Sequence, residues 1–123
     1  MQVGDVIRFE RTFTNKDVEQ FTEISKDAGV HHIQSDDEGR LMVQGLLTAT
    51  LPTKIGGEYN VLARTMNFEF LKPVFTNDTI LCEVTVEQYE EDSYNRKHIH
   101  TSFSCTNQHS IEVLKGSFSG VIK

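Results

Sequence analysis

Two side chains, Asp27 and His32, have the residue types and the spacing for proton-transfer chemistry. A carboxylate and an imidazole can both exchange protons with a substrate or with a water molecule. Further along the chain, Gly45 opens a mostly apolar segment, residues 46–51, that is typical of a helix. The N–H groups at a helix start can stabilise a developing negative charge. An enzyme of carbonyl chemistry needs a base and such donors, so Asp27, His32 and Gly45 are candidate catalytic residues.

The spacing alone leaves a structural alternative open, and on its own it favours that alternative. Asp27 would then cap a helix end, and His32 would be a surface loop residue. The neighbouring His31 suggests a two-histidine metal site, but no third ligand has suitable spacing, so we expect no metal there. His98 and His100 share one face of a predicted strand, and a solvated face or a subunit contact explains them better than a metal does.

Length, composition and charge exclude several classes of function. The chain has 123 residues, which favours one domain spanning residues 1–123. Its net charge of -6 argues against nucleic acid as a partner, because binding phosphates requires a basic surface. No apolar run is long enough to cross a membrane and no signal peptide is visible, so we expect a cytoplasmic protein without a membrane partner. Cys82 and Cys105 are expected to be free thiols.

The first part of the sequence predicts a strand, a helix and an exposed loop. Alternating apolar residues over 6–13 indicate a short strand. Thr14, with Asp17 three residues later, indicates an N-terminal cap for a helix over roughly 15–25. The apolar face of this helix consists of Val18, Phe21 and Ile24. Residues 30–43 are polar and irregular and are expected to form a loop.

A buried helix and four strands are expected in the rest of the chain. Residues 46–55 are apolar around most of the helix circumference, which predicts a buried helix. Pro52 is expected to kink it or tighten its last turn, and Gly56-Gly57 to end it. A change of apolar phase in the last strand predicts a bulge near Lys115-Gly116. The expected strands cover residues 60–71, 79–89, 97–106 and 111–122. The predicted fold class is α+β, with an antiparallel sheet wrapped around the 46–55 helix.

Four segments in order resemble motifs of the MaoC-like dehydratases, which include the (R)-specific enoyl-CoA hydratases of the hot-dog fold. Phe13 to Phe21 resembles F-T-x-x-D-V-x-x-F, and Asp27 to His32 resembles D-x-N-P-x-H. Phe70 to Thr79 resembles F-L-R-P-V-x-x-G-D-T, and Gly45-Leu46-Leu47 is similar to the end of H-G-M-L. Four matches in order over roughly 90 residues are fairly specific. The chain departs from the family at Gly29, Val30 and Gln44, where the family has Asn, Pro and His.

The resemblance implies a hot-dog fold and an enzyme that interconverts trans-2-enoyl-CoA and (R)-3-hydroxyacyl-CoA. Asp27 and His32 would activate one water, and the Gly45 N–H would bind the thioester oxygen. No cofactor is expected, because coenzyme A is part of the acyl-CoA substrate. The predicted substrate-binding residues are Gln44, Leu46, Arg64 and Lys72, with Arg40 and Lys54 as further candidate cations for the phosphates of coenzyme A.

Two other functions stay open at this point, because hot-dog proteins also include thioesterases and non-catalytic members. An acyl-CoA thioesterase would direct a carboxylate at the thioester carbon, whereas the Asp27/His32 pair argues for hydration. A non-catalytic acyl-CoA binding protein is made credible by Gly29 and Gln44. In all three cases a sheet with unprotected edges leads us to expect a homodimer or a dimer-based oligomer.

Overall fold

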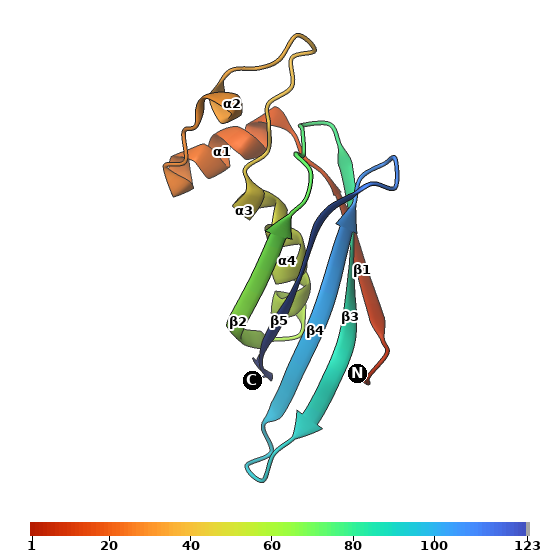
Figure 1. Ribbon diagram of the computed structural model, residues 1–123. Helices are drawn as coiled ribbons and strands as arrows, with labels where there is room; N and C mark the ends of the chain where they lie inside the picture. Colours follow the sequence, from red (N-terminus) through yellow and green to blue (C-terminus); the bar gives the residue numbers. More distant parts are fainter. Residues whose placement is uncertain (123) are drawn as a thin grey trace.

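Five antiparallel strands form one sheet in the order β1-β3-β4-β5-β2, which confirms the predicted α+β class (Figure 1). The computed structural model describes residues 1–122, so Lys123, the last residue of the predicted domain, lies outside the described residues. The strands are β1 (Val6–Thr12), β2 (Val61–Phe70), β3 (Thr79–Glu91), β4 (Lys97–Thr106) and β5 (Glu112–Ile122). The helices are α1 (Asn15–Ser25), α2 (Val30–Ile33), α3 (Gly45–Thr48) and α4 (Thr50–Glu58).

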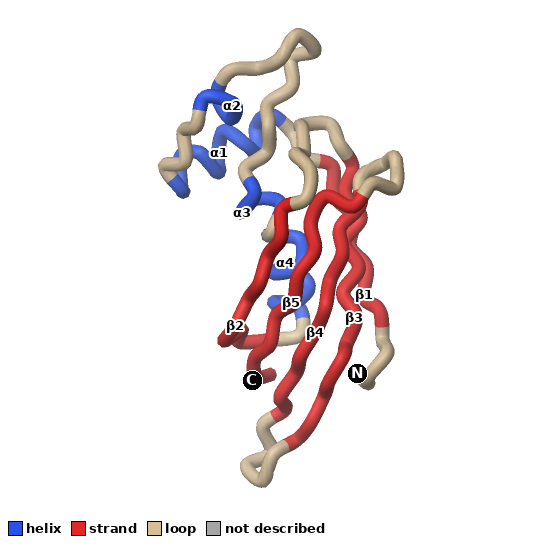
Figure 2. The backbone as a smooth tube through the Cα atoms, viewed as in Figure 1, coloured by secondary structure: helices blue, strands red, loops and turns tan. Residues whose placement is uncertain are grey.

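The helices are divided between one face and one end of the sheet. In Figures 1 and 2, α4 lies along the sheet, whereas α1, α2 and α3 gather at the end opposite the two termini. The candidate catalytic residues Asp27, His32 and Gly45 lie in or next to these three helices. The sheet and α4 therefore form the support on which the site is built.

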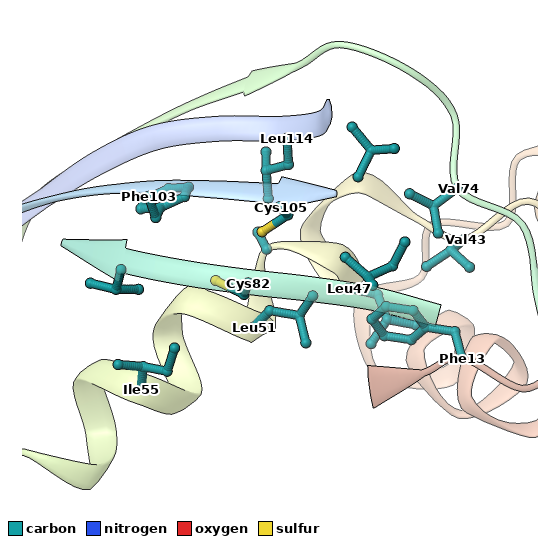
Figure 3. Close-up of a cluster of buried hydrophobic side chains, with 14 of the residues drawn as sticks. Phe13, Val43, Leu47, Leu51, Ile55, Val74, Cys82, Phe103, Cys105 and Leu114 are labelled. Carbon is teal, nitrogen blue, oxygen red and sulfur yellow. The ribbon is translucent and has the colours of Figure 1, made fainter. Parts of the chain in front are cut away.

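The hydrophobic core fills the space between α4 and the inner face of the sheet (Figure 3). Leu51 and Ile55 of α4 are fully buried there, and each such side chain stabilises the fold by roughly 1.5–3 kcal/mol. Cys82 and Cys105 lie opposite each other on β3 and β4 and are free, as the sequence predicted. The hydrogen bond with Cys105, together with burial, raises the pKa of the Cys82 thiol, so that this thiol is neutral in the folded protein.

Helix α1 has the predicted bounds, but its predicted apolar face is only partly buried. The capping box is formed in both directions: the Asp17 N–H donates to the Thr14 hydroxyl, and the Thr14 N–H donates to the Asp17 carboxylate. Val18 is buried, whereas Ile24 is 82% exposed, contrary to the prediction. The reason is that α1 lies at the end of the sheet, so that its last turn extends past the core.

The predicted 46–55 helix is two helices, α3 and α4, which meet at Ala49. This break places Pro52 in the first turn of α4, where a proline removes no intrahelical hydrogen bond. The disruption predicted for Pro52 is thus found as a break at Ala49, three residues before the proline and not in the last turn of the helix. The predicted end at Gly56-Gly57 is wrong, because α4 continues to Glu58. No helix within residues 1–122 is long and apolar enough to span a membrane.

Two further local predictions need correction. Residues 30–43 are not an uninterrupted loop, since Val30–Ile33 form α2 and Met42 makes an isolated bridge with Phe75. The bulge in β5 lies at Val113, between the residues paired with Cys105 and Thr106, two residues before the predicted Lys115-Gly116. The β5 residues on the two sides of this bulge therefore face the core with opposite parity, as the change of apolar phase indicated.

Candidate active site

Asp27 and His32 are brought together by two successive changes in backbone direction. Helix α1 ends at Ser25, and the left-handed conformation of the next residue, Lys26 (φ 63°), turns the chain towards Asp27. Gly29 then caps α2, and His32 falls on the buried side of that short helix, with 7% of its surface exposed. As a result, Asp27 Oδ2 lies 3.7 Å from His32 Nε2. The alternative of a surface loop histidine is therefore excluded.

The hydrogen bond on the far side of the imidazole determines which nitrogen of His32 carries the proton. His32 Nδ1 lies 2.6 Å from the carbonyl oxygen of Met42. A carbonyl can only accept, so Nδ1 carries the hydrogen of the neutral imidazole. Nε2 then has a free lone pair, and it is this atom that faces Asp27. A fixed tautomer of this kind prepares Nε2 to accept a proton.

Asp27 differs from His32 in its exposure to solvent. Its side chain is 54% exposed, and its Oδ1 accepts a hydrogen bond from the Gly29 N–H at 3.4 Å. That bond orients the carboxylate and leaves Oδ2 directed at the imidazole. The separation of 3.7 Å exceeds a direct hydrogen bond but allows both groups to contact one small polar molecule between them.

A cavity of about 350 Å³ opens beside the imidazole, between α2, α3 and the end of β2. It is lined by His31 and His32 of α2, by Gly45 and Thr48 of α3, and by Phe70 and Lys72 at and just after the end of β2. Its remaining walls are mainly apolar, as suits the acyl part of a ligand. The cavity was not predictable from sequence periodicity, because its walls come from segments far apart in the chain.

Gly45, the first residue of α3, lines this cavity. Its N–H has no intrahelical partner, and no acceptor for it occurs in the described part of the chain. A Cβ at this position would lie 2.8 Å from Phe70 Cε1, so only glycine fits beneath the ring without a shift. The Gly45 N–H is therefore available to a ligand in the cavity.

The other predicted substrate-binding residues lie in three different environments. Lys72 lines the cavity. Gln44 is buried behind it and is bonded to α1, while Leu46 is exposed and does not line it. Arg64 lies in a separate groove with His98 and His100, formed by β2, β3, β4 and β5. Within one chain, only Lys72 of these four contacts the cavity.

The remaining candidate cations are already engaged. Arg40 pairs with Asp36 at 2.9 Å and with Glu38 at 3.3 Å. Lys54 pairs with Glu58 and lies 4.0 Å from the centroid of the Phe9 ring. Across residues 1–122, no cluster of three or more His, Cys, Asp or Glu side chains is arranged to hold a metal ion.

Comparisons with solved structures identify the fold. The (R)-hydratase of A. caviae superposes with a TM-score of 0.86 at 22% identity, covering 99% of this chain and 96% of that chain. The R-hydratase PhaJ1 of Pseudomonas aeruginosa gives a TM-score of 0.83 at 18% identity, covering 99% of this chain and 81% of the other. A MaoC-like dehydratase of Rhodospirillum rubrum gives 0.79 at 15% identity, covering 99% and 92%. This chain has the hot-dog fold of these proteins.

A curated relative agrees with this assignment of the fold. The mitochondrial 3-hydroxyacyl-[acyl-carrier-protein] dehydratase of Arabidopsis thaliana is 25% identical to this chain over an alignment 130 residues long. The alignment covers 99% of this chain and 78% of the relative. No family model matches the chain. The resemblance to hot-dog hydratases and dehydratases that the sequence motifs indicated is confirmed by these matches.

Proposed function

We propose that the protein is a hydro-lyase that interconverts a trans-2-enoyl-CoA and the corresponding (R)-3-hydroxyacyl-CoA. The observation that carries the proposal is that His32, which lines the cavity, has its Nε2 3.7 Å from Asp27 Oδ2. The hydratases and the dehydratase with which this chain shares its fold support the reaction class and the (R) configuration. Acid–base chemistry of this kind requires no cofactor besides the coenzyme A of the substrate.

In the proposed reaction, one water is held between His32 and Asp27. The lone pair of Nε2 accepts a proton from this water while its oxygen forms a bond to carbon 3 of the enoyl group. The π electrons of the double bond move towards the thioester oxygen, and a proton returned from the pair to carbon 2 completes the addition. The carboxylate of Asp27 accepts a hydrogen bond from the second O–H of the water, whose hydrogen stays on the product hydroxyl, and it stabilises the imidazolium that forms. The Met42 carbonyl keeps the imidazole in the required tautomer throughout.

The negative charge on the thioester oxygen requires a donor, and the Gly45 N–H is the proposed one. Gly45 lines the cavity, its N–H has no acceptor in the chain from 1 to 122, and the ring of Phe70 lies against its Cα. Donors of this type typically contribute roughly 2.7–4 kcal/mol of transition-state stabilisation. Lys72, at the cavity wall, is the proposed contact for a phosphate of coenzyme A.

A set of three measurements on the purified protein tests the proposal. Crotonyl-CoA should lose its enoyl absorbance and yield (R)-3-hydroxybutyryl-CoA, whereas hexanoyl-CoA should release no free thiol. Calorimetric titration with coenzyme A should detect binding. Thiol release from hexanoyl-CoA would instead indicate a thioesterase, and binding without either reaction would indicate a non-catalytic acyl-CoA binding protein.

A further inference from the structure

The side chain of Gln44 is buried between α1 and the segment that leads into α3. It is 1% exposed, and its Nε2 donates to Thr22 Oγ1 at 2.8 Å and to the Val18 carbonyl at 3.4 Å. The Thr22 hydroxyl donates to the same carbonyl at 2.9 Å. The Gln44 amide thus holds the segment that leads into α3 against the turn of α1 from Val18 to Thr22.

The hydrogen bonds of Gln44 join α1 to the segment Met42–Gln44, and each of these two parts of the chain helps to place one member of the Asp27/His32 pair. On the α1 side, the Thr22 carbonyl accepts from the Lys26 N–H at 2.9 Å, and this bond ends the helix one residue before Asp27. On the other side, the carbonyl of Met42, two residues before Gln44, holds His32 Nδ1 at 2.6 Å. The separation of the carboxylate from the imidazole therefore depends on how α1 is held against the Met42–Gln44 segment.

Gln44 is poorly suited to a role in stability alone. Its Oε1 is buried, and it finds no hydrogen-bond donor in the part of the chain that the structure describes. A buried acceptor without a donor destabilises the folded state, whereas an apolar side chain of similar size would avoid that cost. The amide at this position is therefore better explained by the hydrogen bonds from its Nε2 to α1, which hold the two segments together.

We propose that Gln44 is a positioning residue, whose buried amide fixes the distance between Asp27 and His32 by binding Thr22. This inference rests on the proposed function, and it gives Gln44 a role other than the substrate contact predicted from the sequence. The substrate need not touch Gln44, since its side chain lies outside the cavity lining.

Four variants of the full chain test this role. Gln44→Met removes the amide at similar volume, Thr22→Val removes the hydroxyl, and Thr22→Ser keeps it. Thr101→Val is the matched control, because Thr101 is also buried and donates to the Phe118 carbonyl at 3.3 Å within the sheet. Measurements are kcat and KM with crotonyl-CoA, the melting temperature, and the ¹⁵N chemical shifts of the His32 imidazole.

Gln44→Met and Thr22→Val should each lower kcat roughly 10–100-fold and change KM less than about threefold. Gln44→Met should melt at or above the wild-type temperature, and the double variant should be little worse than either single one. Thr22→Ser should restore nearly full activity. Thr101→Val should lower the melting temperature without lowering kcat.

Wild-type kcat in Gln44→Met would overturn the positioning role. A loss of kcat that only accompanies a loss of stability, as judged against Thr101→Val, would overturn it too. If the wild type hydrates no thioester, the proposed function fails, and the chemical shifts then decide the positioning role separately. The His32 nitrogen shifts should differ from wild type in Gln44→Met and Thr22→Val but not in Thr101→Val; unchanged shifts in all three would refute it.

Discussion

At the scale of single residues, the Asp27/His32 pair makes the most direct prediction. Asp27→Asn and His32→Gln nearly preserve shape but remove the capacity to transfer a proton. Each should lower the rate of crotonyl-CoA hydration by about 10²–10⁴-fold, and the double variant should be little worse, because the two groups act on one water. Steady-state kinetics measures the loss, and the melting temperature should change by only a few degrees.

The Gly45 N–H can be tested with a pair of substitutions that separate sterics from hydrogen bonding. Gly45→Ala and Gly45→Pro both place a Cβ against the Phe70 ring, which is partly exposed and can move. Only proline removes the N–H, and proline is well tolerated at the first position of a helix. Gly45→Pro should therefore have a kcat roughly 10²–10³-fold below that of Gly45→Ala. Equal kcat values for the two variants would remove Gly45 from the proposed mechanism.

At the scale of elements, the capping box of α1 links stability to pH. Burial alone would raise the pKa of Asp17, but hydrogen bonds from Thr14 and the Arg11 guanidinium at 3.0 Å outweigh it and lower that pKa. Asp17 therefore stabilises the fold above its unfolded pKa, near 3.8, and this contribution disappears as the pH falls through the lower folded value.

Asp17→Ala should accordingly cost about 1 kcal/mol in the free energy of unfolding at neutral pH. The difference from wild type should stay constant down to about pH 5 and shrink in more acidic solution. Urea denaturation at a series of pH values measures it. Glu19→Ala, an exposed position of the same helix, is the control and should change the free energy much less. A difference that grows on acidification would contradict the assignment.

At the scale of the whole molecule, the open edge of β2 leads us to expect a homodimer. β2 is the last strand in the sheet order, and its apolar residues Leu62, Met66 and Phe70 are exposed. An edge of this kind is usually covered by another chain. Since Phe70 also lines the cavity, a second copy bound along β2 would lie next to the candidate site.

Sedimentation velocity at micromolar concentration should therefore give the mass of a dimer. Met66→Glu should shift the protein towards a monomer and lower hydration activity, because it introduces a charge into the proposed contact. Tyr94→Glu is a matched control, since Tyr94 is an exposed aromatic residue in the β3–β4 turn and should leave the mass unchanged. A monomeric wild type would contradict the expectation.

The sequence by itself determined those features that depend on neighbours along the chain. Thr14 and Asp17 are three residues apart, and a helix cap is made by such local contacts, so α1 was predicted with its observed bounds. Alternation of apolar residues likewise predicted the strands and the α+β class, because the faces of a strand alternate with every residue. The residue types and spacing of Asp27 and His32 were also visible, together with the motifs that resemble the hot-dog hydratases.

Only the tertiary structure decided which residues meet across long stretches of sequence. The tautomer of His32 depends on Met42, the space at Gly45 depends on Phe70, and the role of Gln44 depends on Thr22 of another helix. The exposure of Ile24 and the break at Ala49 depend on where the sheet ends and how α3 and α4 pack. These contacts follow from packing between distant segments, which a pattern of neighbouring residues does not encode.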